Sequence, residues 1–180
     1  MSSANRDSST LPYDDGMAGR QPPVRYIDRT RDQYSALGYG EYAWVHEPEA
    51  APFAPLRKPI AESKLGLVAS GGIYRHGQTA FTFKDDTTYR AIATDVDSAE
   101  LRATHFAYDL TDARRDINCV FPIDTLRGLV AAGDVGSLAS NFYTCMGGIY
   151  STRRVRDELA PAIVQRCLDD EVDALLLVPV

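Results

Sequence analysis

The sequence is poor in cysteine, has no long apolar run and carries no excess of positive charge, and each absence excludes a class of protein. Its three cysteines, Cys119, Cys145 and Cys167, are widely spaced and include no CxxC pair. That pattern argues against a disulfide framework and against a zinc site. The formal net charge of −6 argues against a nucleic-acid partner, because phosphate binding favours a basic surface.

The chain also lacks the segments that direct a protein into or across a membrane. The most apolar run, residues 174–180, is far shorter than the ~20 residues that cross a bilayer. The N-terminus has no apolar segment of the kind found in signal peptides. We therefore expect a cytoplasmic protein with reduced thiols and no membrane partner. Cys119 and Cys145 are the better candidates for reactivity, because they lie beside polar or glycine-rich segments.

Composition divides the 180 residues into three parts. Residues 1–24 are rich in Ser, Asp, Arg, Gly and Pro and predict a disordered leader. Residues 25–63 predict a short helix over 29–37, followed by a strap in which prolines alternate with aromatic residues. Residues 64–180 predict an α/β domain, which we expect to be the N-terminal part of a larger unit.

Two short apolar runs, residues 64–70 and 173–180, have apolar side chains on both faces and predict buried, parallel strands. The alternating segments 88–94 and 100–106 predict two further strands in an antiparallel appendage, and residues 74–84 predict an irregular excursion. Residues 135–146 are a mixed segment that is consistent with one more strand.

Two helices complete the predicted domain. One begins near Pro122 and ends at Gly133, and the other covers residues 152–168, with a kink expected at Pro161. The fold class that follows is α/β: a small, mostly parallel sheet flanked by helices and incomplete at its C-terminus, behind a disordered N-terminal tail.

The candidate site is the polar stretch 104–124, which places a His, a Tyr, four Asp, an Asn and a Cys between a predicted strand and a predicted helix. Polar groups this dense are costly to order unless they bind or react with something. The alternative is structural. In that case His105 is a hydrogen-bonded residue at a strand end, Asp109 and Asp116 cap turns, Cys119 is a small apolar residue, and Asp124 complements a helix dipole.

A second candidate is the turn formed by Ser70, Gly71 and Gly72 after the first strand. Glycines there let backbone amides approach a ligand closely, and such a turn can form a nest for an anion. The turn matches neither the dinucleotide fingerprint nor the P-loop, so a nucleotide is not indicated.

Six segments together resemble the selenoprotein B family, which comprises the large subunits of glycine, sarcosine and betaine reductases, a D-proline reductase subunit and smaller relatives. They are Tyr-Ile-Asp-Arg-Thr-Arg-Asp-Gln-Tyr-Ser-Ala-Leu-Gly-Tyr at 26–39, Pro-Phe-Ala-Pro-Leu-Arg-Lys-Pro at 52–59, Thr-His-Phe-Ala-Tyr-Asp at 104–109, Asn-Cys-Val-Phe-Pro-Ile-Asp-Thr-Leu-Arg at 118–127, Gly-Ser-Leu-Ala at 136–139 and Asp-Ala-Leu-Leu-Leu-Val-Pro-Val at 173–180.

The resemblance implies that the last strand leads into a redox motif, in which a selenocysteine or cysteine lies three positions from a second cysteine. This sequence stops immediately before that position, at Val180. We therefore expect no cofactor or metal within this chain. A selenocysteine codon immediately after Val180 that is read as a stop, a truncation of the chain and a degenerate paralogue would each explain such an end, and these alternatives stay open. Without that nucleophile the chain is expected to be inactive by itself.

The implied activity is that of an oxidoreductase, which reductively cleaves the C–N bond alpha to a carbonyl in a small amino-acid-like substrate, with a thiol electron donor. His105, Asp109 and Cys119 are then the expected catalytic residues. The expected substrate-binding residues are Tyr108, Asn118 and the turn of Ser70, Gly71 and Gly72.

Two other functions stay open. One is a non-catalytic binding or accessory subunit that retains the pocket scaffold, and the weaker one is a hydrolase or isomerase that uses His105 and Asp109. In either case the last predicted strand exposes an apolar edge or face, which predicts a homo-oligomer or a partner subunit.

Overall fold

The computed structural model describes residues 25–41, 45–51 and 54–180, which fall in two units, Met1–Pro48 and Glu49–Val180. The described part of the first unit contains helix α1, Tyr26–Ala36, which confirms the predicted helix in that region. Gly38 follows it with a φ of 78°, a conformation that favours glycine. The predicted leader over 1–24 lies outside the described residues, as do residues 42–44 and 52–53 of the predicted strap.

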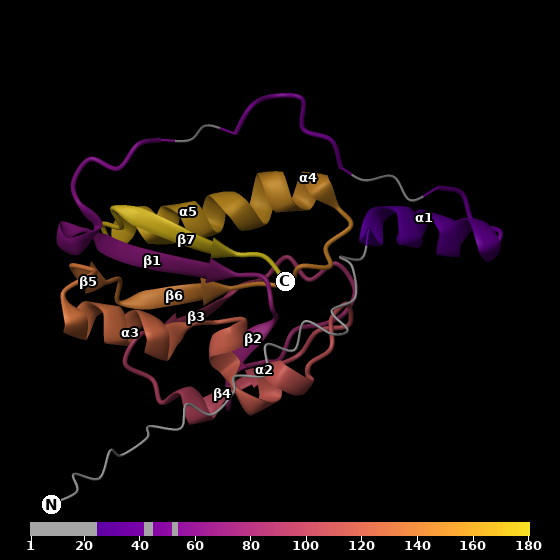
Figure 1. Ribbon diagram of the computed structural model, residues 1–180. Helices are drawn as coiled ribbons and strands as arrows, with labels where there is room; N and C mark the ends of the chain where they lie inside the picture. Colours follow the sequence, from indigo (N-terminus) through magenta and orange to yellow (C-terminus); the bar gives the residue numbers. More distant parts are fainter. Residues whose placement is uncertain (1–24, 42–44, 52–53) are drawn as a thin grey trace, which may run out of the picture. The chain divides into compact units, whose positions relative to one another are not determined.

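The second unit is built on a five-stranded sheet with β1, Lys64–Ala69, near its centre (Figure 1). Strand β7, Ala174–Val178, pairs in parallel along one edge of β1. Strands β5, Ser137–Leu138, and β6, Asn141–Thr144, pair in parallel with successive halves of its other edge. Strand β3, Arg90–Ala93, is antiparallel to β6. The α/β class is confirmed. The burial predicted for both apolar strands holds for β1 but is wrong for β7, because β7 lies at the edge of the sheet.

The predicted antiparallel appendage is wrong. Strand β3 joins the main sheet, where Ile92 lies opposite Phe142 of β6. Strand β4, Leu101–Ala103, instead pairs with β2, Ile73–Arg75, in a separate two-stranded antiparallel sheet. The irregular excursion predicted over 74–84 therefore begins inside a strand, because β2 includes Tyr74 and Arg75. Alternation identifies a strand but carries no information about its partner, which depends on contacts far along the chain.

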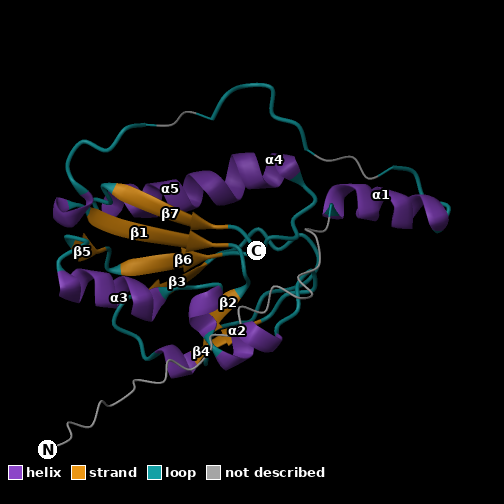
Figure 2. Ribbon diagram, viewed as in Figure 1, coloured by secondary structure: helices purple, strands orange, loops and turns teal. Residues whose placement is uncertain are grey.

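Helices cover both faces of the main sheet (Figure 2). Helix α3, Ile123–Ala132, begins after Pro122 and ends at Gly133, whose φ of 82° is left-handed, as predicted. On the other face, α4, Thr152–Arg154, continues through a π-helical turn, Val155–Leu159, into α5, Ala160–Asp169. Pro161 lies in the first turn of α5, directly after the π-helical turn, where its missing N–H is tolerated.

The remaining elements are short. Helix α2, Thr111–Arg115, follows the candidate stretch, and single 3-10 turns occupy Ile60–Glu62, Ser98–Glu100 and Ile117–Cys119. Within the described ranges, no helix is long and apolar enough to cross a membrane.

Alternation along the strands divides the core into two clusters, one on each face of the sheet. Phe142 and its neighbour Tyr143 belong to different clusters. On the α3 face, Phe142 and Phe121 are fully buried and meet edge to face, with ring centroids 6.1 Å apart. Each buried phenylalanine stabilises the fold by roughly 1.5–3 kcal/mol.

Strand β7 has β1 as its only described partner and forms an edge of the sheet. Three consecutive apolar side chains on it stay accessible: Leu175 is 41% exposed, Leu176 37% and Leu177 65%. The apolar edge expected from the sequence is therefore present.

We predict that Gly72→Ala destabilises the protein far more than Gly77→Ala. Both glycines have a positive φ, 68° and 93°, so both alanines incur the left-handed backbone penalty of roughly 1–2 kcal/mol. A Cβ on Gly72 would also collide with the backbone carbonyl oxygen of Thr104, whereas one on Gly77 meets nothing within 4 Å. Urea unfolding should show that Gly72→Ala costs at least about 2 kcal/mol more. Equal losses would contradict the close approach of Thr104.

Candidate functional site

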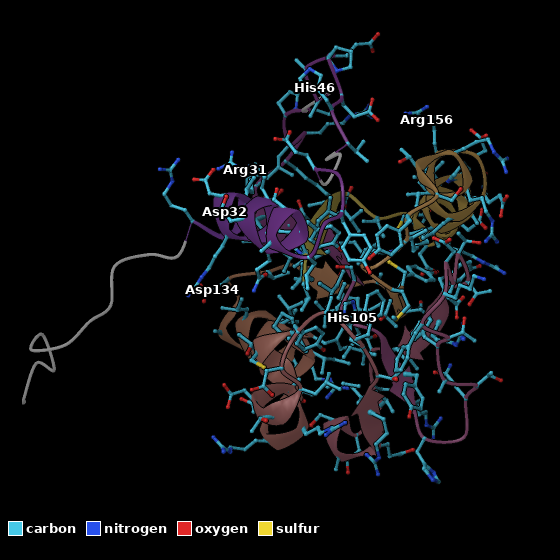
Figure 3. All side chains as sticks on the ribbon, turned by 90° about the vertical axis from the view of Figure 1, so that its right-hand side faces the viewer. Arg31, Asp32, His46, His105, Asp134 and Arg156 are labelled. Atoms are coloured by element: carbon cyan, nitrogen blue, oxygen red, sulfur yellow. The ribbon has the colours of Figure 1, made fainter. Side chains whose placement is uncertain are left out.

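The candidate site lies where strands β1, β6 and β7 finish. Three segments meet there: the turn after β1, the residues after β6, and Val180 after β7. His105, which follows β4, reaches the same place. Figure 3 looks onto this end of the molecule and shows His105 among the packed side chains. Ligands of open α/β sheets bind at this end of the strands.

Gly147 marks the centre of the site. A Cβ built on it would lie 2.7 Å from the Val180 carbonyl oxygen, 3.2 Å from Ser70 Oγ and 3.3 Å from His105 Nε2. Ser70 Oγ also accepts a hydrogen bond from the Val180 N–H at 3.0 Å. A hydroxyl, an imidazole and the backbone of Val180 therefore approach Gly147 so closely that only glycine fits at this position.

His105 is a neutral imidazole held by backbone amides. It is only 5% exposed, and burial lowers its pKa below the ordinary value. Its Nδ1 accepts the Ala107 N–H at 3.0 Å, and its Nε2 lies 3.3 Å from the Gly147 amide nitrogen in accepting geometry. A neutral imidazole accepts at only one nitrogen, so these two bonds are alternatives. The shorter bond, to Ala107, favours the tautomer that carries its proton on Nε2, toward the site.

Four rings are linked by contacts that include His105. Tyr108 lies 4.8 Å from His105 between ring centroids, Phe106 stacks on His105 at 5.5 Å, and Phe83 meets Phe106 edge to face at 5.9 Å. The Tyr108 hydroxyl donates to the Gly71 carbonyl at 2.9 Å. Burial, and then the neighbouring Cys119 thiol, raise the pKa of Tyr108, so it remains a donor.

The turn predicted to form an anion nest has most of its amides in use. The Ser70 N–H donates to the Val178 carbonyl, and the Gly72 N–H donates to the Cys145 carbonyl, both at 3.0 Å. These bonds extend the sheet by one residue. The turn therefore offers a ligand at most the Gly71 amide and the Ser70 hydroxyl proton.

Asp109 and Asn118 are held outside this cluster. Asp109 is exposed and accepts from the N–H and hydroxyl of Thr111, which lower its pKa. Asn118 bridges Asp116 and Asp124 at the start of α3, and it lines a separate cavity of about 650 Å³ between β4 and α2. These are the turn-cap contacts expected from the structural alternative. Arg127 pairs with Asp124 at 2.7 Å.

All three thiols of the chain have pKa values above the ordinary value of cysteine, which disfavours the thiolate form. Burial raises the pKa of Cys145 to about 11, because the residue directly follows strand β6 inside the fold. The expectation that Cys145 is reactive is therefore wrong. Cys119 is exposed, but partial desolvation and then Asp116 raise its pKa, and burial raises that of Cys167. Within the described ranges, no three His, Cys, Asp or Glu side chains gather closely enough to hold a metal ion.

Five of the residues predicted from the sequence lie together at this site: Ser70, Gly71, Gly72, His105 and Tyr108. Three further residues of the site were not predicted: Gly147, Phe106 and Phe83. A signal for Gly147 was present, because the pair Gly147-Gly148 directly follows a strand, as the first glycine pair does. No local signal identifies the two phenylalanines, which approach each other from segments more than twenty residues apart.

Comparison with known proteins gives one consistent result. The family model for glycine/sarcosine/betaine reductase selenoprotein B matches residues 40–180. D-proline reductase subunit gamma of Acetoanaerobium sticklandii is 30% identical over 135 residues, 74% of this chain and 56% of that protein. Glycine reductase complex component B subunit gamma of Symbiobacterium thermophilum is 29% identical over 134 residues, 72% of this chain and 31% of that protein.

A third relative, sarcosine reductase complex component B subunit beta of Peptoclostridium acidaminophilum, is 27% identical over 138 residues, 72% of this chain and 30% of that protein. The matched region thus covers from about a third to about half of these relatives' lengths. No solved structure matches the chain.

We predict that the buried, neutral state of His105 makes stability depend on pH. The unfolded chain takes up a proton at this residue near pH 6.5, whereas the folded chain resists it. The free energy of unfolding should therefore be fully maintained above about pH 6.5 and fall as the pH is lowered below it.

Urea unfolding at several pH values between 5 and 7.5 should show a flatter dependence in His105→Asn, whose side-chain oxygen retains an acceptor for the Ala107 N–H. His76→Asn, on the exposed turn after β2, is the control and should follow the wild type. A His105→Asn curve parallel to that of the wild type would contradict the assignment.

Proposed function

The chain belongs to the glycine/sarcosine/betaine reductase selenoprotein B family, and we propose that it forms the substrate-binding scaffold of such a reductase. The reaction is reductive cleavage of the C–N bond alpha to a carbonyl in a small amino-acid-like substrate. The observation that carries the proposal is the meeting of Ser70 Oγ, His105 Nε2 and Val180 around Gly147. This site receives the substrate and the attacking atom.

The attacking atom comes from outside these 180 residues. A thiol attacks as its anion, and all three cysteines of the chain have raised pKa values. The proposed nucleophile is a thiol or selenol held next to Val180, such as a selenocysteine immediately after it. There the Nε2–H of His105 and the hydroxyl of Ser70 are placed to stabilise an anion.

In the proposed reaction the anion attacks the α-carbon, a carbon–sulfur or carbon–selenium bond forms, and the C–N electron pair leaves with the amine. Because the leaving group is already a cationic ammonium, it departs as a neutral amine and needs no proton from the protein. A neutral His105 is therefore sufficient, since it has only to donate a hydrogen bond. One thiol of a dithiol donor then attacks the sulfur or selenium, the carbon takes up a proton and leaves as the reduced product, and the second thiol releases the nucleophile.

This chemistry assigns no acid or base role to Asp109 and no resolving role to Cys119. The exposed Asp109 carboxylate is bound to Thr111, which also weakens the case for a hydrolase or isomerase that pairs it with His105. A dithiol cycle requires a reducing compartment, and we place the protein in the cytoplasm.

A second candidate function is a non-catalytic accessory subunit that retains this scaffold. The raised pKa values of the three thiols favour it, as does the apolar edge of β7. The named relatives are subunits of reductase complexes. In either function, we propose that the exposed backbone edge and leucines of β7 pair with a second copy or with a partner subunit.

We predict that Leu177→Lys weakens self-association through this edge. Leu177 is 65% exposed, more than Leu175 or Leu176 on the same strand, and a lysine there opposes strand pairing. Light scattering over a range of concentrations should give a lower average mass for this variant than for the wild type. Leu129→Lys, on α3, is the control and should behave as the wild type. A wild type that stays monomeric throughout would contradict self-association.

The catalytic proposal is tested by appending one cysteine after Val180. Its thiol should ionise below the ordinary ~8.5, because the donors of Ser70 and His105 stabilise the anion. Alkylation with iodoacetamide at several pH values, followed by peptide mass spectrometry, should show it reacting faster than Cys119 in the same molecule. Ser70→Ala and His105→Asn should each raise its pKa again.

With dithiothreitol as the donor, the extended protein should release methylamine from sarcosine, whereas a protein extended with serine should not. A thiol of ordinary pKa that releases no amine would support the accessory function instead.

A further inference from the structure

The cavity between β4 and α2 is separate from the candidate site, because none of the residues around Gly147 lines it. Figure 2 shows β2, β4 and α2 together, outside the main sheet. The cavity volume of about 650 Å³ falls within the range of roughly 300–1,000 Å³ that is usual for small-molecule sites. The proposed reaction assigns no role to this cavity.

The lining of the cavity is positively charged. Three arginines line it, Arg102 of β4 and Arg114 and Arg115 of α2, and Asp116 is the single carboxylate among the lining residues. Three positive charges against one negative charge leave +2, whereas the whole chain has a formal net charge of −6. A local excess of positive charge on an acidic chain favours an anionic ligand.

Asp116 already has hydrogen-bond partners within the protein. Its Oδ1 accepts from the backbone N–H of Asn118 at 2.9 Å and from the side-chain amide of the same residue at 3.0 Å. Among the described residues, Asp116 forms no ion pair with any of the three arginines. The arginines are therefore not neutralised by the one carboxylate that shares the cavity with them.

The guanidinium of Arg102 is held in place by the backbone. Its Nη1 donates to the carbonyl oxygens of Ala99 at 2.8 Å and Leu101 at 2.7 Å, which uses both Nη1 protons. Its Nε and Nη2 donate no hydrogen bond to the described residues. The edge that carries these two nitrogens stays open, and such an edge binds a phosphate or a carboxylate through two parallel hydrogen bonds.

The two arginines of α2 also have donors to spare. Among the described residues, the guanidinium of Arg114 forms no hydrogen bond or ion pair. Arg115 contacts Asp112 through one bond of 3.4 Å, and both side chains are more than three-quarters exposed. An exposed pair of this kind contributes little to stability, so Arg115 can exchange Asp112 for a ligand at small cost.

The cavity has an apolar part as well. Leu101, Ala113 and Ile117 line it and belong to the buried core, and Tyr74 lies opposite Arg102 across the two-stranded sheet. A bare inorganic anion would leave this apolar surface in contact with water. A ligand that carries an apolar part beside its anionic group would cover it, which stabilises the complex further.

We propose that this cavity binds a small organic dianion, either a phosphate monoester or a dicarboxylate. The doubly charged group lies between Arg102 on β4 and the arginines of α2, and the apolar part of the ligand packs on Leu101 and Ile117. This second site goes beyond the proposed function and does not depend on it.

The test compares four aromatic probes of similar size that differ in charge. Phenyl phosphate and phthalate are dianions, benzoate is a monoanion and benzyl alcohol is neutral. At about pH 8 the phosphate ester is doubly charged, because its second pKa is about 6. Binding to the 180-residue protein is measured by isothermal titration calorimetry, and the shifts of backbone amide signals in NMR spectra locate the bound probe.

We expect at least one dianion to bind about tenfold or more tightly than benzoate, because it gains charge-assisted hydrogen bonds to a further guanidinium. Benzyl alcohol should show no measurable binding. The amide signals of residues 99–103 and 113–118 should shift. The tighter of the two dianions identifies the anionic group as a phosphate or a pair of carboxylates.

Arg114→Gln and Arg102→Gln should each weaken the binding of the preferred dianion by about tenfold. Arg114→Lys should lose less, because it keeps the charge but not the planar fork. Arg153→Gln, on α4, makes the same change in net charge at a side chain that is 72% exposed and should leave binding unchanged. Urea unfolding checks that each variant is folded, and Arg114 has no guanidinium contact whose loss would disturb the fold.

Equal affinities for benzoate and both dianions would overturn the inference, and so would the absence of binding by every probe. Equal losses in Arg114→Gln and Arg153→Gln would also overturn it, because only general charge attraction would then remain. Amide shifts confined to the residues around Gly147 would place the anion at the candidate site and would contradict a second site.

Discussion

The parallel pairing of β1 with β7 is the interaction on which the site depends. It joins Leu65 to Ala174 and Ala69 to Val178, segments more than one hundred residues apart in the chain. Because the strands run in the same direction and in this register, their ends coincide, and Ser70 meets Val180. Strand β6 finishes on the other edge of β1 and brings Gly147 to the same place. A shift of the register by one residue would separate these groups and turn each β7 side chain to the opposite face of the sheet.

Burial then decides the chemistry of the groups that are brought together. Desolvation acts against charge, so it keeps His105 neutral and the Cys145 thiol protonated. The site consequently has hydrogen-bond donors gathered closely around a glycine, but no ionised nucleophile of its own. This combination suits a scaffold that receives a reactive group from elsewhere, and it agrees with a reaction in which the leaving group is already cationic. The rings of Tyr108 and Phe106 pack against the buried His105 ring and help to fix its position.

Family membership and the geometry of the structure give different information about this protein. Membership identifies a reductase family, and the matched relatives are longer proteins of which this chain covers from about a third to about half. In the structure, the polar residues of the stretch 104–124 fall into two groups. His105 and Tyr108 face the end of the sheet, whereas Asp109 and Asn118 stabilise α2 and the start of α3. Residues four apart in a loop can serve unrelated purposes, because a single turn of chain redirects the side chains between them.

Secondary-structure elements that depend on neighbouring residues can be predicted from the sequence alone. Apolar runs identified β1 and β7, Pro122 and Gly133 bounded α3, and the density of polar groups after residue 104 indicated the site. Contacts between distant parts of the chain place β3 in the main sheet and bring Phe83 to Phe106. They also pair the amides of Ser70 and Gly72 with backbone carbonyls. The reason is physical. Helix caps and strand periodicity depend on neighbours within a few residues, whereas strand partners, burial and the pKa values that follow from it depend on contacts that the chain makes only when it is folded.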